Sequence, residues 1–223
     1  MLGIKDLRKN SQSIVCALTA MEVTFESGNE TLHATLYSDL STISSAGVVL
    51  CPPHPLHGGN RHDTRIVTVA RELSKHGLLA LCMDYGSYGR GIREVQHILD
   101  AVAFMQRKGI SALGLLGYSF GAVVASNAAA TAEADGFVAM SILRHVNDLT
   151  AKLDFEGPKL FVHGRRDDLA SYSDFKRLYA ETKGVKHKLV LDTDHFYMDN
   201  YPTVIKTTAE TIRRFFQESL KKR

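Results

Sequence analysis

The stretch that most restricts the fold is LGLLGYSFGAVVA, residues 113–125, where one serine interrupts an apolar run and a glycine stands two residues away on each side. The run before the serine is typical of a buried strand, and the run after it is typical of a buried helix. A chain that turns from strand to helix within one residue needs small neighbours, which the two glycines supply. We therefore predict a strand over 112–116, a sharp turn, and a helix over 120–130.

The rest of the chain alternates strand and helix patterns. An antiparallel hairpin is predicted where Met21–Glu26 and Thr31–Tyr37 flank the turn residues 27–29. Further strands are predicted over Ala46–Cys51, Leu78–Met83, Gly136–Ile142, Lys159–His163 and Lys186–Leu191. Helices are predicted over Asp63–His76, Ile92–Lys108, Ser173–Thr182 and Thr203–Leu220. This order predicts an α/β fold with a mostly parallel central sheet, an N-terminal hairpin and helices on both faces.

Length and composition narrow the class of protein. A chain of 223 residues with 44% hydrophobic content is expected to form a single domain over 1–223. A net charge of +3 and a pI of about 8.7 are too weakly basic for a dedicated nucleic-acid binder. No apolar stretch approaches the roughly 18 residues of a membrane span, so we expect no membrane partner.

Cysteine usage and the N-terminus bear on location. The three cysteines, an odd number without C-x-x-C spacing, are expected to be buried reduced thiols in a cytoplasmic protein: Cys16, Cys51 and Cys82. The apolar segment Ile14–Ala20 follows basic residues and weakly resembles a signal peptide, but it lacks a clean cleavage site. We expect a monomer or a homodimer.

The interrupting residue, Ser119, becomes a nucleophile only beside a base that is oriented by an acid. The strand over 159–163 runs into GRRDD, and the strand over 186–191 runs into DTDHF. The carboxyl ends of parallel strands meet at one edge of a sheet. We therefore predict a catalytic triad of Ser119, Asp167 and His195. Of the neighbouring acids, Asp168 is expected to cap its turn, and Asp194 is poorly placed to orient the adjacent ring.

Four segments together resemble the α/β-hydrolase family, particularly its small lidless and dienelactone-hydrolase-like members: GYSFG, HGRRD, DHF and PHPLHGG. The resemblance covers nearly the whole chain, and it implies the same three triad residues. It also implies that the loop after the third strand supplies the Leu56 N–H as an oxyanion donor, beside the Phe120 N–H at the helix start. Where many relatives have His-Gly, this chain has His54-Pro55, and the proline removes one backbone donor.

These features predict a serine hydrolase that cleaves small carboxylic esters through an acyl-enzyme, without a cofactor or metal. The group His54, His57, His62 and Asp63 lacks the glutamate and helical context of a zinc protease. Because residues 143–157 leave room for one short helix and little more, we expect an open pocket suited to short acyl groups. Candidate substrate-binding residues are His54, Tyr85, Tyr88, Tyr118, Arg165 and Arg166.

Two alternatives stay open at this stage. Arg165 and Arg166, with Arg61 and Arg90, would form a basic rim suited to an acyl-CoA thioester, or the first two would simply balance the adjacent aspartates. A catalytically silent binding module on the same fold is the alternative from another class. Likewise, Tyr85 and Tyr88 either line the pocket or pack under a loop.

Overall fold

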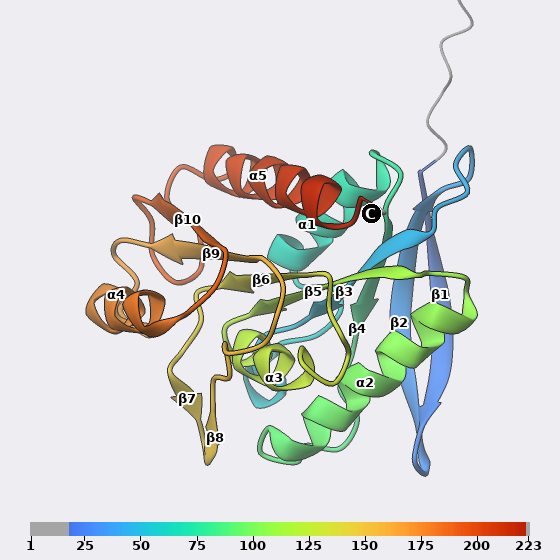
Figure 1. Ribbon diagram of the computed structural model, residues 1–223, viewed down its shortest axis with the longest axis horizontal. Helices are drawn as coiled ribbons and strands as arrows, with labels where there is room; N and C mark the ends of the chain where they lie inside the picture. Colours follow the sequence, from blue (N-terminus) through green and yellow to red (C-terminus); the bar gives the residue numbers. More distant parts are fainter. Residues whose placement is uncertain (1–17, 222–223) are drawn as a thin grey trace, which may run out of the picture.

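The computed structural model describes residues 18–221, and within them eight strands form one sheet in the order β1-β2-β4-β3-β5-β6-β9-β10 (Figure 1). The β1–β2 and β2–β4 pairs are antiparallel, and the other pairs are parallel. The strands are β1 (Leu18–Ser27), β2 (Glu30–Asp39), β3 (Ala46–Cys51), β4 (Leu79–Met83), β5 (Ala112–Tyr118), β6 (Gly136–Met140), β9 (Lys159–Gly164) and β10 (Lys186–Leu191). The predicted fold class is confirmed.

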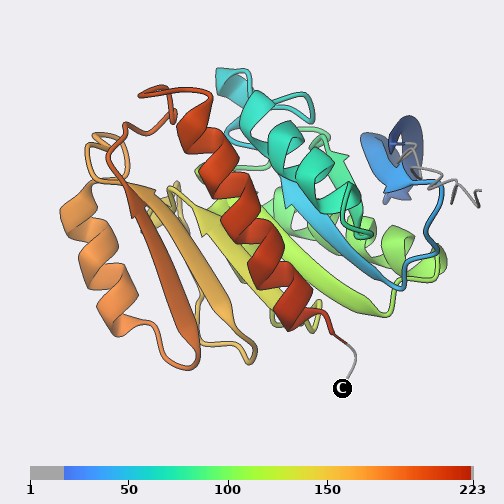
Figure 2. The same cartoon turned by 90° about the horizontal axis from the view of Figure 1, so that it is seen from above.

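Helices cover both faces of the sheet, as Figures 1 and 2 show. They are α1 (Thr64–Ser74), α2 (Ile92–Arg107), α3 (Phe120–Ala128), α4 (Tyr172–Glu181) and α5 (Thr203–Ser219). The apolar side chains of α1 and α5 pack together on one face, and those of α2, α3 and α4 pack on the other. The sheet is therefore buried between two apolar layers, which explains why its central strands read as continuous hydrophobic runs.

The order of strands brings two loops together. β3 leads through α1 to β4 on one side, whereas β5 leads through α3 to β6 on the other. In open α/β sheets such a reversal leaves a crevice at the carboxyl ends of the strands, where ligands bind. Here the reversal places the loop after β3 next to the turn after β5. A short 3-10 helix, η1 (Pro55–His57), lies in the first of these loops.

Strand β5 extends two residues beyond the predicted range because its pairing with β6 continues to Tyr118, opposite Met140. The strand therefore ends immediately before Ser119. At the start of α1, the Asp63 carboxylate accepts a 3.0 Å hydrogen bond from the Arg65 N–H. Asp63 is thus the N-cap of this helix rather than its first residue.

The connection between β6 and β9 differs from the prediction. In place of one short helix, residues 143–157 contain a two-stranded antiparallel pair, β7 (His145–Val146) and β8 (Leu149–Thr150) (Figure 1). Asn147 and Asp148 form the turn, and Asn147 has a φ of 49°. Asn and Asp tolerate this left-handed conformation, so the dipeptide favours a hairpin over a helix. The segment is still short, as expected.

Two of the three predicted buried cysteines are described. Cys51 and Cys82 are buried free thiols, and burial raises the pKa of both. Cys16 and most of the segment that resembles a signal peptide lie outside the described residues. Among the helices of residues 18–221, none combines the length and the apolar character needed to cross a membrane.

Candidate active site

Ser119 occupies the turn between β5 and α3 with φ 56° and ψ −117°, a backbone conformation that L residues rarely adopt. The glycines on each side permit this turn. A Cβ atom on Gly117 would clash with the carbonyl oxygen of Gly121, and one on Gly121 would clash with the carbonyl oxygen of Pro52. Gly121 therefore lets α3 approach the backbone that follows β3. The predicted steric role of both glycines is confirmed.

The three residues predicted as a triad lie together at the carboxyl ends of β5, β9 and β10. The Ser119 Oγ atom lies 3.0 Å from His195 Nε2. The His195 Nδ1 atom lies 2.9 Å from each carboxylate oxygen of Asp167. All three are buried, with exposed fractions of 9% for Ser119, 4% for His195 and 5% for Asp167. This arrangement can pass a proton from the hydroxyl to an imidazole whose tautomer is fixed by a carboxylate.

The acid turn selects Asp167 over its neighbour. Asp167 Oδ1 also accepts hydrogen bonds from the N–H groups of Leu169 at 3.1 Å and Ala170 at 2.7 Å. Burial raises the pKa of Asp167, but the bonds from His195 and from the Ala170 N–H outweigh it and hold that pKa below its ordinary value. Asp168 is exposed. The cap that we expected from Asp168 is thus made by Asp167.

The base turn is held by Tyr118 and Asp194. The Tyr118 hydroxyl donates a 2.9 Å hydrogen bond to the carbonyl oxygen of His195. Asp194 Oδ1 accepts from the N–H groups of Phe196 and Met198 at 3.1 and 3.0 Å. Tyr118, predicted to bind substrate, is only 1% exposed. It therefore lies beneath His195 rather than on a substrate surface, because its ring packs in the apolar layer between the sheet and helices α1 and α5.

In the loop after β3, one N–H bonds a side chain instead of a backbone oxygen. The N–H groups of His57 and Gly59 donate to the carbonyl oxygen of His54, and that of Gly58 donates to Pro55. Pro55 has no N–H, so within residues 55–59 only Leu56 has an N–H that bonds no backbone oxygen. It donates instead to His54 Nδ1 at 3.2 Å. The Phe120 N–H, the other predicted donor, belongs to the first turn of α3, where N–H groups have no helical partner.

An aromatic cluster surrounds the Phe120 side chain. The ring centroids of His54, Tyr85 and Tyr88 lie 4.6, 5.8 and 6.3 Å from that of Phe120. Each of the three is half-buried. The structure therefore groups these three predicted substrate-binding residues around Phe120, where their rings pack under the loop and keep some exposure.

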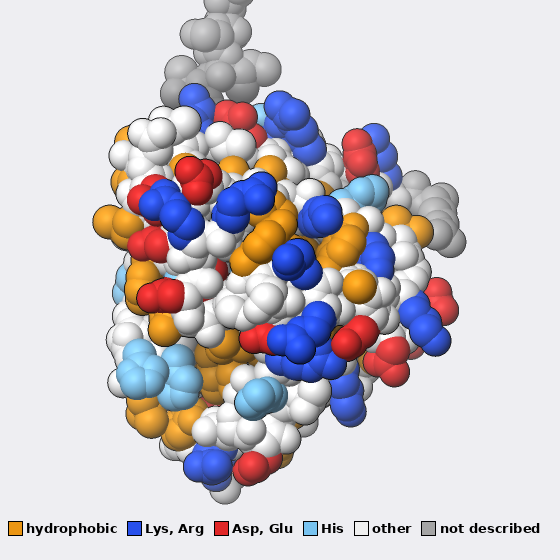
Figure 3. All heavy atoms as spheres, turned by 90° about the vertical axis from the view of Figure 1, so that its left-hand side faces the viewer, with side chains coloured by type: hydrophobic (Ala, Val, Ile, Leu, Met, Phe, Trp, Pro, Cys, Tyr) orange, Lys and Arg blue, Asp and Glu red, His pale blue; other side chains and the backbone are white. Residues whose placement is uncertain are grey.

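The predicted basic rim is largely balanced within the chain. Arg166 pairs with Asp192 and Asp199 at 3.1 and 3.0 Å. Arg61 pairs with both Glu22 and Asp84, and Arg90 pairs with Asp148. Arg165 lies over the Tyr172 ring at 5.5 Å. Figure 3 shows basic and acidic side chains interspersed on the end of the molecule that lies to the left in Figure 1.

The histidine-rich loop is occupied by other contacts. The Asp63 carboxylate pairs with Arg65, and His54 Nδ1 accepts from Leu56. Within residues 18–221, no three His, Cys, Asp or Glu side chains gather as metal ligands would.

Three buried residues with polar side chains lie near these side chains and were not predicted from the sequence: Ser141, His163 and Tyr197. The His163 Nε2 atom lies 2.8 Å from the carbonyl oxygen of Ala170, whose N–H bonds Asp167. The Ser141 hydroxyl lies 3.1 Å from the Tyr197 hydroxyl, which donates to the carbonyl oxygen of Val162. His163 stands inside HGRRD and Tyr197 two residues after His195, so proximity to the motifs was the only available signal.

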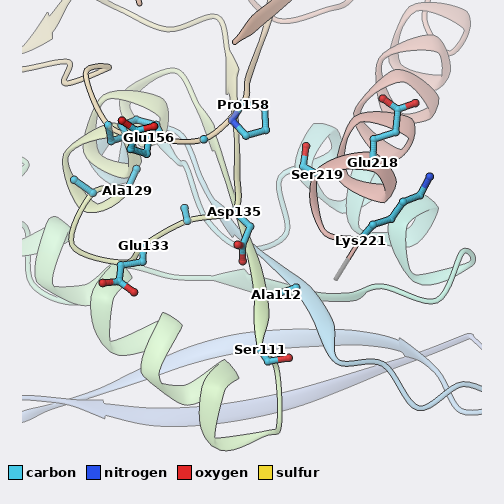
Figure 4. A pocket seen from close by; sticks show the side chains of 14 residues that line it. Ser111, Ala112, Ala129, Glu133, Asp135, Glu156, Pro158, Glu218, Ser219 and Lys221 are labelled. Carbon is cyan, nitrogen blue, oxygen red and sulfur yellow. The ribbon is translucent and has the colours of Figure 1, made fainter. Parts of the chain in front are cut away.

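The structure also has a cavity away from this site. A cavity of about 1180 Å³ lies where β5 begins and α5 ends, at the edge of the sheet opposite Ser119 (Figure 4). Carboxylates from Glu133, Asp135, Glu156 and Glu218 line it. Asp135 is committed to the fold, since it accepts a 2.8 Å hydrogen bond from the Leu113 N–H.

Comparison with known proteins gives structural neighbours only: no family model and no curated protein matches the sequence. A serine hydrolase homologue from Coxiella burnetii has a TM-score of 0.77 and 18% identity, covering 90% of this chain and 97% of its own. A serine hydrolase without a lid from Xanthomonas campestris has a TM-score of 0.71 and 18% identity, covering 90% and 93%. An esterase from Pyrococcus furiosus has a TM-score of 0.77 and 17% identity, covering 92% and 95%.

The fold defined by these likenesses is the α/β-hydrolase fold, and it spans most of the chain. The predicted resemblance is therefore confirmed at the level of the fold. The proteins that share this fold include serine hydrolases and esterases, as the names of the three neighbours state. At these identities the likeness carries no substrate across to this chain.

Proposed function

We propose that this protein is a serine hydrolase that cleaves carboxylic esters of short acyl chains. The observation that carries the proposal is the unbroken series of hydrogen bonds from Ser119 through His195 to Asp167. In the proposed reaction, Ser119 Oγ attacks the ester carbonyl while His195 Nε2 takes its proton. His195 then gives that proton to the departing alcohol, and water attacks the acyl-enzyme by the same route.

The developing oxyanion is proposed to bind the N–H groups of Phe120 and Leu56. Each donor of this kind contributes about 3 kcal/mol to lowering the barrier when it points at the developing charge. Phe120 follows the nucleophile directly, and the contact of Gly121 with the Pro52 carbonyl keeps the second loop close to it. Both proposed donors are backbone groups, so only the loop conformation sets their position.

Short acyl chains are proposed because the features around Ser119 leave the site uncovered by a lid. The connection from β6 to β9 carries only the β7–β8 pair, and the aromatic cluster of His54, Tyr85, Tyr88 and Phe120 fills the space beneath the loop after β3. A thioesterase with a basic CoA-binding rim receives less support, since three of the four arginines are paired with carboxylates.

The test is hydrolysis of p-nitrophenyl esters from acetate to octanoate by the wild type and by Ser119→Ala. We expect activity that is highest for short chains and at least about 10³-fold lower in the variant. A variant that keeps most of the activity would show that Ser119 is not the nucleophile. Rates that rise toward octanoate would contradict the preference for short acyl chains.

A silent binding module on this fold makes a different prediction. A fluorophosphonate reacts covalently with an activated serine, and the product is detected as a mass increase on the peptide that contains Ser119. We expect labelling of the wild type and none of Ser119→Ala. An unlabelled wild type would favour the binding module.

A further inference from the structure

The Leu56 N–H, which the proposed function assigns to the oxyanion, is not free in the resting protein. It donates to the imidazole Nδ1 of His54 at 3.2 Å. The other N–H groups of residues 57–59 donate to backbone carbonyls, which cannot move away without unfolding the loop. The Leu56 N–H, in contrast, donates its hydrogen bond to a side chain, and a ligand can displace a side chain.

The His54 ring is held on several sides. Its centroid lies 4.6 Å from that of Phe120, 4.7 Å from that of His57 and 5.2 Å from that of Tyr88. Its Nε2 atom lies 3.2 Å from the Tyr88 hydroxyl, which also accepts a 2.9 Å hydrogen bond from the Asn147 side chain. Asn147 belongs to the β7–β8 turn. In the free protein these contacts hold the ring in the position that faces the Leu56 N–H.

These partners define the protonation of the ring. Nδ1 accepts from Leu56 only if it carries no proton, which places the proton of a neutral imidazole on Nε2, facing Tyr88. Burial, and then the neighbouring His57, lower the pKa of His54 and favour this neutral form. The resting loop thus presents a neutral nitrogen acceptor to the N–H that an oxyanion would use.

We infer that His54 is a positioning residue that masks the Leu56 N–H in the free enzyme and releases it when a substrate oxygen arrives, an inference that rests on the proposed function. A neutral carbonyl displaces a neutral imidazole nitrogen on roughly equal terms. An oxyanion displaces it readily, because charge-assisted hydrogen bonds are about twice as strong. The mask keeps the donor paired and correctly aimed without occupying it permanently.

The mask has a distinct kinetic signature. Without the mask, neither the substrate nor the transition state has to break the hydrogen bond between the Leu56 N–H and His54 before it binds. Interactions that change equally in both states alter KM and leave kcat unchanged. Loss of one neutral hydrogen bond of typical strength corresponds to a fall in KM of about fivefold. A residue that merely supports the loop would lower kcat when it is replaced.

The central variant is His54→Phe, which keeps an aromatic ring against Phe120 and has no acceptor. With p-nitrophenyl acetate we expect its KM to fall about fivefold at unchanged kcat. His54→Asn restores an acceptor that suits a helix N-cap, and we expect its KM to return toward the wild-type value. His62→Phe changes an exposed ring that lies outside the contacts of His54, so its constants should stay at wild-type values. A lower kcat at unchanged KM in His54→Phe would overturn the inference.

A measurement independent of turnover separates this inference from the proposed function. In ¹⁵N-labelled protein, we expect the Leu56 amide proton to move upfield in His54→Phe, because its hydrogen bond is lost. An unchanged resonance overturns the mask whatever the activity.

A second variant covers the case in which His54→Phe does not fold. Tyr88→Phe removes the partner of His54 Nε2, and we expect the Leu56 amide to exchange faster with deuterium in it. Unchanged exchange counts against the mask. A wild type that hydrolyses no ester and resists the fluorophosphonate refutes the proposed function instead.

Discussion

The Tyr118 hydroxyl donates a 2.9 Å hydrogen bond to the backbone carbonyl of His195, so the residue before the proposed nucleophile holds the turn that carries the proposed base. The two residues are 77 positions apart in the sequence. This bond couples the end of β5 to the loop after β10, and the Arg65 guanidinium packs on the Tyr118 ring at 4.6 Å. The Ser119–His195 distance therefore depends on a contact that lies beneath the site.

This contact predicts that Tyr118→Phe is a positioning variant. The ring and its packing stay, but the His195 carbonyl loses a buried partner, which costs about 1–2 kcal/mol of stability. We expect kcat for short esters to fall about 3- to 10-fold, with fluorophosphonate labelling of Ser119 slowed by a similar factor. Steady-state kinetics and denaturant unfolding test both effects. Wild-type kcat in a destabilised variant would show that the bond serves the fold alone.

Asp167 and Asp168 offer a matched pair of variants. Asp167→Asn keeps the shape of the side chain but removes the charge that orients the His195 ring, so we expect kcat/KM to fall about 10³- to 10⁴-fold. Asp168→Asn removes an exposed carboxylate next to it and should change kcat/KM less than twofold. Equal losses in the two variants would contradict the assignment of the acid.

The sequence predicted the parts of this site that depend on residues close together in the chain, and it did not predict those that depend on contacts between distant residues. The turn at Ser119 depends on Gly117 and Gly121, and Asp167 and His195 stand in the short loops that follow β9 and β10, so motif and strand order together predicted them. The burial of Tyr118 was not predictable, since its hydroxyl is satisfied by a carbonyl far away in the chain. Period-2 alternation is absent from a strand buried on both faces, and the sequence does not indicate which face Tyr118 occupies.

The same difference between local and long-range contacts decides which parts of the fold were predicted. Strand β3 matches its predicted range, Ala46–Cys51, because a short apolar run between turn signals is unambiguous there. The β7–β8 pair was missed because two-residue strands have no periodicity, and the only signal was the dipeptide Asn147-Asp148. The pairing of Arg61 with Glu22 and Asp84 joins three separate segments, which composition and spacing do not reveal.

Gly121 is predicted to be far less tolerant of substitution than a glycine in open space. In Gly121→Ala the new methyl group meets the backbone of Cys51 and Pro52, which cannot move without displacing the loop after β3, so we expect at least about 2 kcal/mol of destabilisation and slower labelling of Ser119. Gly28→Ala serves as the control. Gly28 has a φ of 58° with nothing near its Cβ position, so only backbone strain of about 1 kcal/mol is expected. Equal costs would contradict the close approach.

The stability of the protein is predicted to fall as the pH drops from 6.5 to 4.5. Burial lowers the pKa of His54, His97 and His163 from the ordinary value of 6.5, so below that pH the unfolded chain binds protons that the folded chain excludes. The carboxylates with lowered pKa contribute stability that is lost only below their ordinary values of 4.5 or 3.8; they are Glu22, Glu30, Asp167 and Asp174. The window above pH 4.5 therefore reports the histidines.

His163 is the clearest test of this pH dependence, because it is fully buried and its ring stacks on Phe175 at 4.3 Å. His163→Phe keeps a stacked ring and removes the titrating group. We expect urea unfolding to show a smaller decline in the free energy of unfolding between pH 6.5 and 4.5, by at most about 1.4 kcal/mol per pH unit. The variant loses the bond to Ala170, so the slope against pH, and not the absolute stability, is the quantity to compare. Parallel slopes would mean that His163 takes up its proton in the folded protein.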